Sequence, residues 1–134
     1  MEEIKIRIET EINPTEDRKK VEKAVTNIFD IISEDIRPIC KEKTLEAKAE
    51  GLETLVKFRN LLSLDRIRAA ARRVFLAGLK GNRIRFFLNK QVAFAGHVSF
   101  SEENAESPLG SIKVTFECKN PKMLINWLAP RKAC

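Results

Sequence analysis

The sequence has few of the residues from which metal and catalytic sites are usually built. It holds one histidine, His97, and three cysteines, Cys40, Cys118 and Cys134, which share no metal-ligand spacing. Structural zinc sites need four Cys or His ligands, so we expect no metal site. An odd cysteine count without a secretion signal predicts free thiols. The scattered glycines form no phosphate-binding loop. With no nucleophile or acid–base motif in view, we expect neither an enzyme nor a bound cofactor.

Long apolar runs are also absent. No segment approaches the roughly 18 consecutive apolar residues of a membrane-spanning helix. The first residues, MEEIKIRIE, alternate charged and apolar side chains, which is unlike a signal peptide. We therefore expect a cytoplasmic protein with no membrane partner. A length of 134 residues, without internal repeats or a linker, predicts a single domain over residues 1–134.

Positive charge, by contrast, is abundant and unevenly distributed. The net charge is +6, and residues 57–90 hold ten Lys or Arg residues against one acid, Asp65. This segment is therefore +9, while the remainder of the chain is −3. Such a concentration of bases is typical of a surface that binds a polyanion such as nucleic acid. The alternative is that these bases form ion pairs with acidic residues elsewhere in the chain.

Hydrophobic periodicity predicts an α+β fold. Alternation of apolar and polar residues indicates strands over residues 4–12, 44–50, 83–89, 98–100 and 112–118. Helical spacing indicates a helix beginning at Asn13-Pro14 and ending before Pro38, two helices over residues 52–62 and 64–78, and one beginning at Asn120-Pro121. Strands with one polar face predict a two-layer sandwich with a mostly antiparallel sheet and helices on one face, in the order β-α-β-α-α-β-β-β-α.

The helix expected over residues 64–78 supplies the first group of candidate contacts. At 100° per residue, Arg66, Arg73 and Lys80 project together, nearly opposite the apolar face. Arg68 and Arg72 lie one helical turn apart on the flank. The planar guanidinium group suits phosphate and stacks on bases. This row, with its flanking pair, is the surface that we favour for binding a polyanion.

The strand that follows supplies a second group. Its alternation turns Arg83 and Arg85 to the open side of the sheet, away from the helix arginines, so we hold them as secondary contacts. Asn89, Lys90 and Gln91 leave the end of this strand. Amides and an ammonium group in this position could contact bases or phosphates. Equally, the two amides could satisfy backbone groups in a tight connection.

Phe87 lies on the same open face as Arg85. An aromatic side chain on a sheet surface can stack on a base. We favour the other reading, in which Phe87 is covered by the C-terminal helix, by Trp127 or by a partner subunit. The open face is otherwise mildly positive, because it gathers Lys5, Arg7, Lys113 and Lys119 against Glu9, Glu11 and Glu117.

Four segments carry a family resemblance: IKIRIETEINPTED, FFLNKQVAFAGHVSF, ESPLGSIKVTF and NWLAP. The most specific piece is LNKQ followed by an aromatic-flanked glycine, here Leu88–Gln91 with Phe94 and Gly96. In these segments the chain resembles an uncharacterised archaeal protein family grouped with predicted RNA-binding proteins, whose fold is similar to that of large-subunit ribosomal protein five. The resemblance covers nearly the whole chain. It implies an α+β fold, an archaeal cytoplasm and an RNA-binding role, and it implies no catalytic residues.

Together, the charge and the resemblance predict a non-catalytic protein that binds structured RNA through the basic helix and the adjoining strand. The candidate RNA-binding residues are Arg66, Arg68, Arg72, Arg73, Lys80, Arg83, Arg85, Asn89, Lys90 and Gln91. The alternative is a homodimeric assembly or protein-interaction module with no nucleic-acid role. Its surfaces would be the open sheet face and the helix that contains Trp127.

Overall fold

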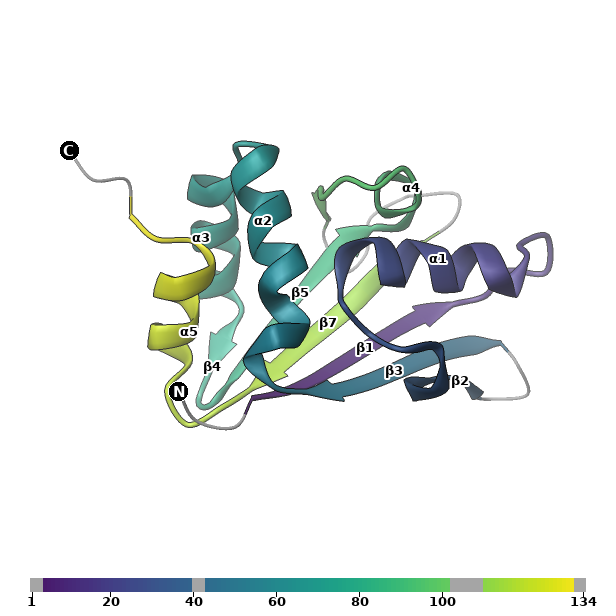
Figure 1. Cartoon of the computed structure of the whole chain (residues 1–134), viewed down its shortest axis with the longest axis horizontal. Helices are drawn as coiled ribbons and strands as arrows, with labels where there is room; N and C mark the ends of the chain where they lie inside the picture. Colours follow the sequence, from purple (N-terminus) through teal and green to yellow (C-terminus); the bar gives the residue numbers. More distant parts are fainter. Residues whose placement is uncertain (1–3, 40–42, 102–109, 132–134) are drawn as a thin grey trace.

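The protein forms two layers, a sheet and a layer of helices that covers one face of it (Figure 1). The computed structural model describes residues 4–39, 43–101 and 110–131. The strands are β1 (Lys5–Glu11), β2 (Ile36–Ile39), β3 (Thr44–Glu50), β4 (Leu79–Lys80), β5 (Arg83–Asn89), β6 (Phe100–Ser101) and β7 (Ser111–Glu117). The helices are α1 (Arg18–Ile28), α2 (Val56–Leu64), α3 (Arg68–Ala77), α4 (Lys90–Phe94) and α5 (Pro121–Leu128), with 3-10 turns η1 (Ser33–Asp35) and η2 (Leu52–Leu55). None of the helices in these ranges is long and apolar enough to cross a membrane.

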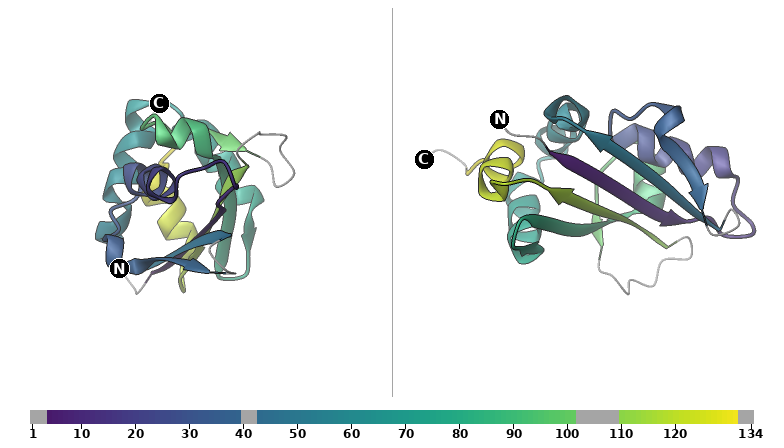
Figure 2. Two further views of the ribbon diagram at one scale, coloured as in Figure 1. Left: turned by 90° about the vertical axis from the view of Figure 1, so that its right-hand side faces the viewer. Right: turned by 90° about the horizontal axis from the view of Figure 1, so that it is seen from below.

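The sheet has the strand order β2-β3-β1-β7-β5-β4, and β6 pairs with β5. All of these pairings are antiparallel. Seen end-on, the helices lie on one side of the molecule and the strands on the other (Figure 2, left). The predicted α+β sandwich, with helices on one face of a mostly antiparallel sheet, is therefore confirmed. The second face of the sheet is open to solvent over the described strands.

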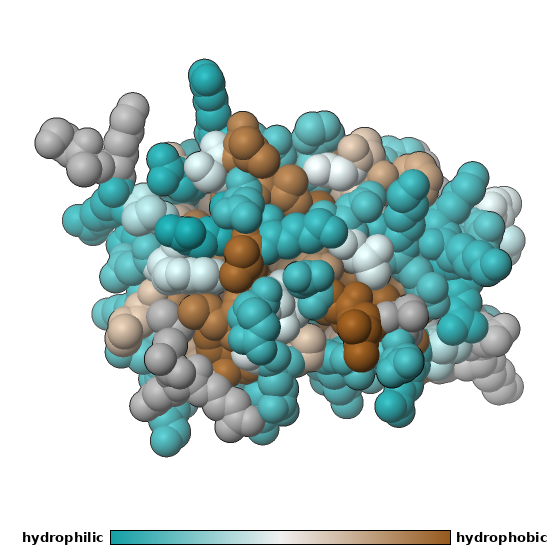
Figure 3. All heavy atoms as spheres, in the orientation of Figure 1, coloured by the Kyte–Doolittle hydropathy of each residue, from teal (hydrophilic) through white to brown (hydrophobic). Residues whose placement is uncertain are grey.

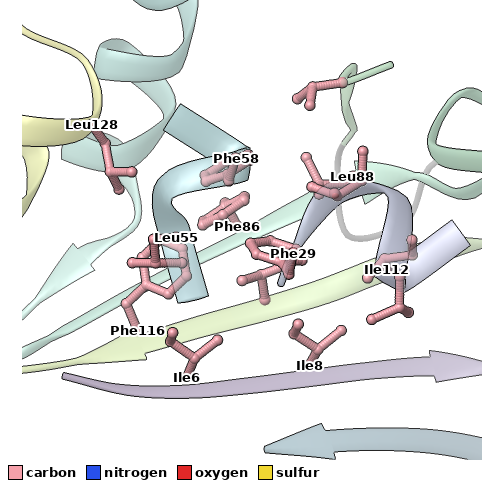
Figure 4. Packing of buried hydrophobic residues seen from close by; sticks show 14 of the residues in the cluster. Ile6, Ile8, Phe29, Leu55, Phe58, Phe86, Leu88, Ile112, Phe116 and Leu128 are labelled. Carbon is pink, nitrogen blue, oxygen red and sulfur yellow. The ribbon is translucent and has the colours of Figure 1, made fainter. Parts of the chain in front are cut away.

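The hydrophobic core lies between the two layers. Alternate strand residues, such as Ile6 and Ile8 of β1, meet the buried stripe of each helix, such as Phe58 and Leu62 of α2. Six of the eight phenylalanines form one cluster with ring centroids 5.0 to 6.5 Å apart, several of which are labelled in Figure 4: Phe29, Phe58, Phe75, Phe86, Phe100 and Phe116. Aromatic pairs at such distances add to the stabilisation that burial provides.

The first helix is shorter than the sequence predicts. Asn13 and the residues after it form a turn, closed by the Asn13 N–H group donating to Glu16 Oε1 at 2.9 Å. The side chain of Asp17 caps α1 instead, and the helix ends before Phe29, whose backbone is extended. The chain then enters β2, an edge strand that the sequence did not predict. An edge position tolerates Pro38, which has no N–H group to donate to a ladder.

The basic helix expected over residues 64–78 begins later than the sequence predicts. α2 continues to Leu64, which is 76% exposed, and α3 begins at Arg68. Between them Arg66 takes a left-handed backbone conformation, with φ of 57°. Lys80 lies beyond the end of α3, in β4. The predicted row of Arg66, Arg73 and Lys80 along one helix is therefore wrong.

Candidate nucleic-acid interface

The open face of the sheet is hollowed into a broad trough of about 1300 Å³. The outward-facing side chains of β1, β3, β5 and β7 form its floor. The β4 hairpin lines it at one end of the strand order, and Asp35 beside β2 lines it at the other. The hairpin packs closely on β5 because Gly78 has no side chain: a Cβ atom there would clash with the carbonyl oxygen of Arg85.

Positive charge is concentrated in the part of the trough that β4, β5 and β7 form. We call this part the β5–β7 basic surface, and its bases are Lys80, Arg83, Arg85 and Lys113. The one acid lining the same part is Glu117, whose carboxylate lies 3.3 Å from Arg83 Nε. Among the described residues, Lys80, Arg85 and Lys113 form no ion pair. Unpaired cations that line one concave surface attract polyanions.

Strand pairing brings these side chains next to one another. Phe87 of β5 lies directly opposite Lys113 of β7, and Arg85 lies opposite Thr115. Lys80 of β4 pairs with Arg83. Neighbouring strands are about 4.8 Å apart, and residues two apart on one strand share a face about 7 Å apart. The half-buried Phe87 is thus flanked by Arg85 along its own strand and by Lys113 across the sheet.

The other half of the trough, formed by β1 and β3, is electrostatically balanced. Arg7 lies 3.1 Å from Glu9 and 2.9 Å from Glu46, and Lys48 lies 3.6 Å from Glu46. Exposed ion pairs of this kind contribute only about 0–1 kcal/mol to stability. They do, however, cancel the local positive charge. The positive field of the open face is therefore strongest over β4, β5 and β7.

The helix layer carries a second, more dispersed set of bases. Arg68 and Arg73 are exposed on α3, and neither forms an ion pair with a described residue. Arg72 has a structural role, because it donates to Asn126 Oδ1 at 2.8 Å and to the Ala129 carbonyl at 3.1 Å, and so ties α3 to α5. This face is largely hydrophilic, with small apolar patches between the polar side chains (Figure 3).

Asp65, the one acid of the basic segment, is also used within the fold. Its Oδ1 atom lies 3.3 Å from His97 Nδ1, and its Oδ2 atom accepts the Val98 N–H group at 3.2 Å. These contacts hold the turn between α2 and α3 against the segment that follows α4. Among the described residues, Asp65 therefore forms no ion pair with an arginine of the basic segment.

The three residues at the end of β5, Asn89, Lys90 and Gln91, have different roles in the structure. Asn89 caps α4 by accepting the Val92 N–H group at 3.1 Å, so here its amide satisfies the backbone. Lys90 is only 2% exposed, and its ammonium group donates to the Glu11 carbonyl at 2.6 Å and to Glu16 Oε1 at 3.0 Å. The expectation that Lys90 contacts RNA is therefore wrong. Gln91 is exposed on α4, away from the trough.

Lys113 and Phe87, which line the trough beside Arg85, are absent from the sequence-based set of contacts. Lys113 stands on the polar face of its strand, and Phe87 stands on the polar face of β5. Both faces can be read from the alternation of each strand. The direct pairing of Phe87 with Lys113 cannot be read from the sequence, because it depends on β5 lying beside β7 in this register.

With the trough described, comparison with known proteins places the chain in a family. A family model described as RNA binding matches residues 5–118. The chain is 45% identical to a UPF0201 protein of Sulfurisphaera tokodaii, over 96% of this chain and 89% of that protein. It is 38% identical to a UPF0201 protein of Saccharolobus solfataricus, over 97% and 90% respectively. The chain belongs to this archaeal UPF0201 family, and the predicted resemblance is confirmed.

Solved structures agree with this assignment. The crystal structure of an uncharacterised UPF0201 protein superposes with a TM-score of 0.83 at 37% identity, covering 96% of this chain and 94% of that one. The UPF0201 protein from Methanococcus jannaschii superposes with a TM-score of 0.76 at 29% identity, covering 96% and 95%. The likeness to large-subunit ribosomal protein five stays a prediction.

Proposed function

We propose that the protein binds RNA, without converting it chemically, through the β5–β7 basic surface of the open sheet face. The observation that carries the proposal is a group of three cations, Lys80, Arg85 and Lys113, that line one trough and form no ion pair with a described residue. The family description as RNA binding supports RNA as the polyanion. Two of the acids that line the trough, Glu9 and Glu117, are held in ion pairs with arginines, which suits binding better than acid–base chemistry.

The expected mode of binding is contact with the phosphate backbone. Each phosphate that a lysine or arginine neutralises releases a counterion, so affinity falls as salt rises. If Lys80, Arg85 and Lys113 each neutralise one phosphate, log K should fall with log salt with a slope of about −2 for single strands and −3 for duplexes. Raising the salt from 50 to 200 mM would then weaken binding roughly 20- to 40-fold.

The test replaces the three cations together and measures RNA binding by fluorescence anisotropy across this salt range. The variant Lys80→Gln/Arg85→Gln/Lys113→Gln should bind labelled RNA more weakly and with a slope closer to zero by about 2 to 3. A matched control removes the same charge from the other layer. The triple variant Arg66→Gln/Arg68→Gln/Arg73→Gln tests the surface that the sequence alone favours, and it should keep most of the affinity.

The outcomes of these binding measurements show whether the trough or the helix layer binds RNA. If the control triple loses binding while the trough triple keeps it, the helix layer holds the site and the proposal for the trough is wrong. If the unmodified protein binds no RNA at 50 mM salt, RNA binding itself is refuted. A denaturing gel of the same samples should show intact RNA, as a non-catalytic role requires.

A further inference from the structure

We infer that Phe87 is a stacking platform for an unpaired base, so that the bound RNA is single-stranded where it crosses β5. The inference rests on the proposed RNA-binding role and specifies the kind of RNA. It assigns a second type of contact to the trough: the cations hold phosphates, and one aromatic ring holds a base. A loop or bulge within a structured RNA would meet this requirement as well as a free strand.

Phe87 is unusual among the aromatic residues of this chain. Six of the eight phenylalanines pack together in the core. Phe94 lies in the helix layer, where the ammonium group of Lys23 sits 5.7 Å from its ring centroid. Phe87 lines the trough on the opposite face of the sheet and is half-buried. It therefore contributes little to the core.

The expected structural cover for Phe87 is not provided by Trp127. The indole ring stacks under the guanidinium of Arg59 at 5.1 Å, and Arg59 Nε donates to the Trp127 carbonyl at 2.9 Å. Both residues belong to the helix layer, on the far side of the sheet from Phe87. The prediction that Trp127 or its helix covers Phe87 is wrong, and the ring faces the trough.

The surroundings of Phe87 match what an unpaired nucleotide presents. A base offers a flat π-face, and the phosphates on either side of it carry negative charge. Around the ring, Arg85 lies two residues away on the same face of β5, and Lys113 lies directly opposite on β7. A base stacked on Phe87 thus brings its flanking phosphates within reach of two unpaired cations. Bases inside an RNA duplex are already stacked on one another and cannot reach the floor of a trough.

Tryptophan fluorescence tests for stacking directly. Phe87→Trp is made in a Trp127→Phe background, so that the new indole is the only one in the chain. The control is Phe94→Trp in the same background, which places the indole on the helix layer. A 12-nucleotide oligouridine should quench the indole at position 87 and leave the indole at position 94 unchanged. A blunt RNA duplex of 12 base pairs should quench neither.

A second variant keeps the test decisive if the tryptophan variant folds poorly. Phe87→Leu retains an apolar side chain but removes the π-face. Stacking on an aromatic side chain is worth about 1–3 kcal/mol per base, so oligouridine binding should weaken about 5- to 150-fold. Duplex affinity should change less than about twofold.

The results distinguish this inference from the proposal on which it rests. If oligouridine binds in a trough-dependent way but Phe87→Leu binds it as tightly as the unmodified protein, the stacking platform is refuted and the basic surface stands. If no RNA binds at low salt, both fall. If sedimentation shows a dimer that Phe87→Leu dissociates, the ring is a subunit contact and the inference is overturned.

Discussion

Replacing Lys90 with methionine should destabilise the fold strongly. The Lys90 side chain is 3% exposed, and its ammonium group bridges the Glu11 carbonyl and the Glu16 carboxylate, which is itself 10% exposed. Glu16 also accepts the N–H group of Asn13. The bridge therefore connects α4 to the segment that joins β1 to α1. Methionine has a similar length but carries no charge, so it would leave a buried carboxylate without its cation.

The size of this loss of stability follows from the Glu16 charge that stays buried after the substitution. Breaking a buried ion pair by removing one partner costs about 3–5 kcal/mol, because the other charge stays buried without compensation. The unfolding entropy of about 2.1 cal/mol/K per residue gives roughly 0.28 kcal/mol/K for 134 residues. The expected fall in Tm is then about 11–18 °C.

Chemical denaturation followed by circular dichroism measures this free energy of unfolding. The control is Lys20→Met on the exposed surface of α1, which should change stability by less than about 0.5 kcal/mol. The double variant Lys90→Met/Glu16→Gln removes both charges, and it should recover at least about 1 kcal/mol relative to the sum of the single variants. A loss below about 1 kcal/mol in Lys90→Met would refute the assignment of Lys90 as a structural residue.

Two further substitutions test the elements that flank the site. Gly78→Ala should destabilise the protein by about 1–3 kcal/mol or more in the same denaturation assay, because the added Cβ meets the rigid carbonyl group of Arg85. Arg72→Ala should lower stability by about 1–2 kcal/mol, because it removes the bonds to Asn126 and Ala129. RNA affinity, measured by anisotropy, should change less than about twofold in Arg72→Ala. A larger loss of affinity would show that Arg72 contacts RNA and would contradict its purely structural role.

The sequence predicts the fold class well because the class depends on periodicity. Alternation over residues 4–12, 83–89 and 112–118 marks one buried face per strand, and the structure buries those faces. The elements that the sequence missed are short. β4 has two residues and α4 has five, so neither is long enough to repeat its pattern a second time. The edge strand β2 was hidden by its proline, which argues against a strand everywhere except at an edge.

The site was harder to predict, because it depends on pairing between distant segments. The sequence predicts a break between two helices at residue 63, whereas α2 continues to Leu64 and α3 begins only at Arg68. Nothing in the pattern marks Arg66 as a residue with a left-handed backbone. Lys90 lies in a polar triplet that suggests a surface, yet the fold brings it 3.0 Å from Glu16, 74 positions earlier in the chain. A buried ion pair of this kind leaves no local trace in either segment.

The segment with a charge of +9 therefore does not act as one surface. Its bases divide among the helix layer, the contacts between α3 and α5, a buried ion pair and the open sheet face. In the trough, by contrast, a base from outside this segment is added: Lys113 of β7 lies opposite Phe87, next to the pair formed by Arg85 and Thr115. A high density of positive charge along a sequence thus predicts a polyanionic ligand. Strand register decides which cations become neighbours, and here it places Arg85 and Lys113 beside Phe87.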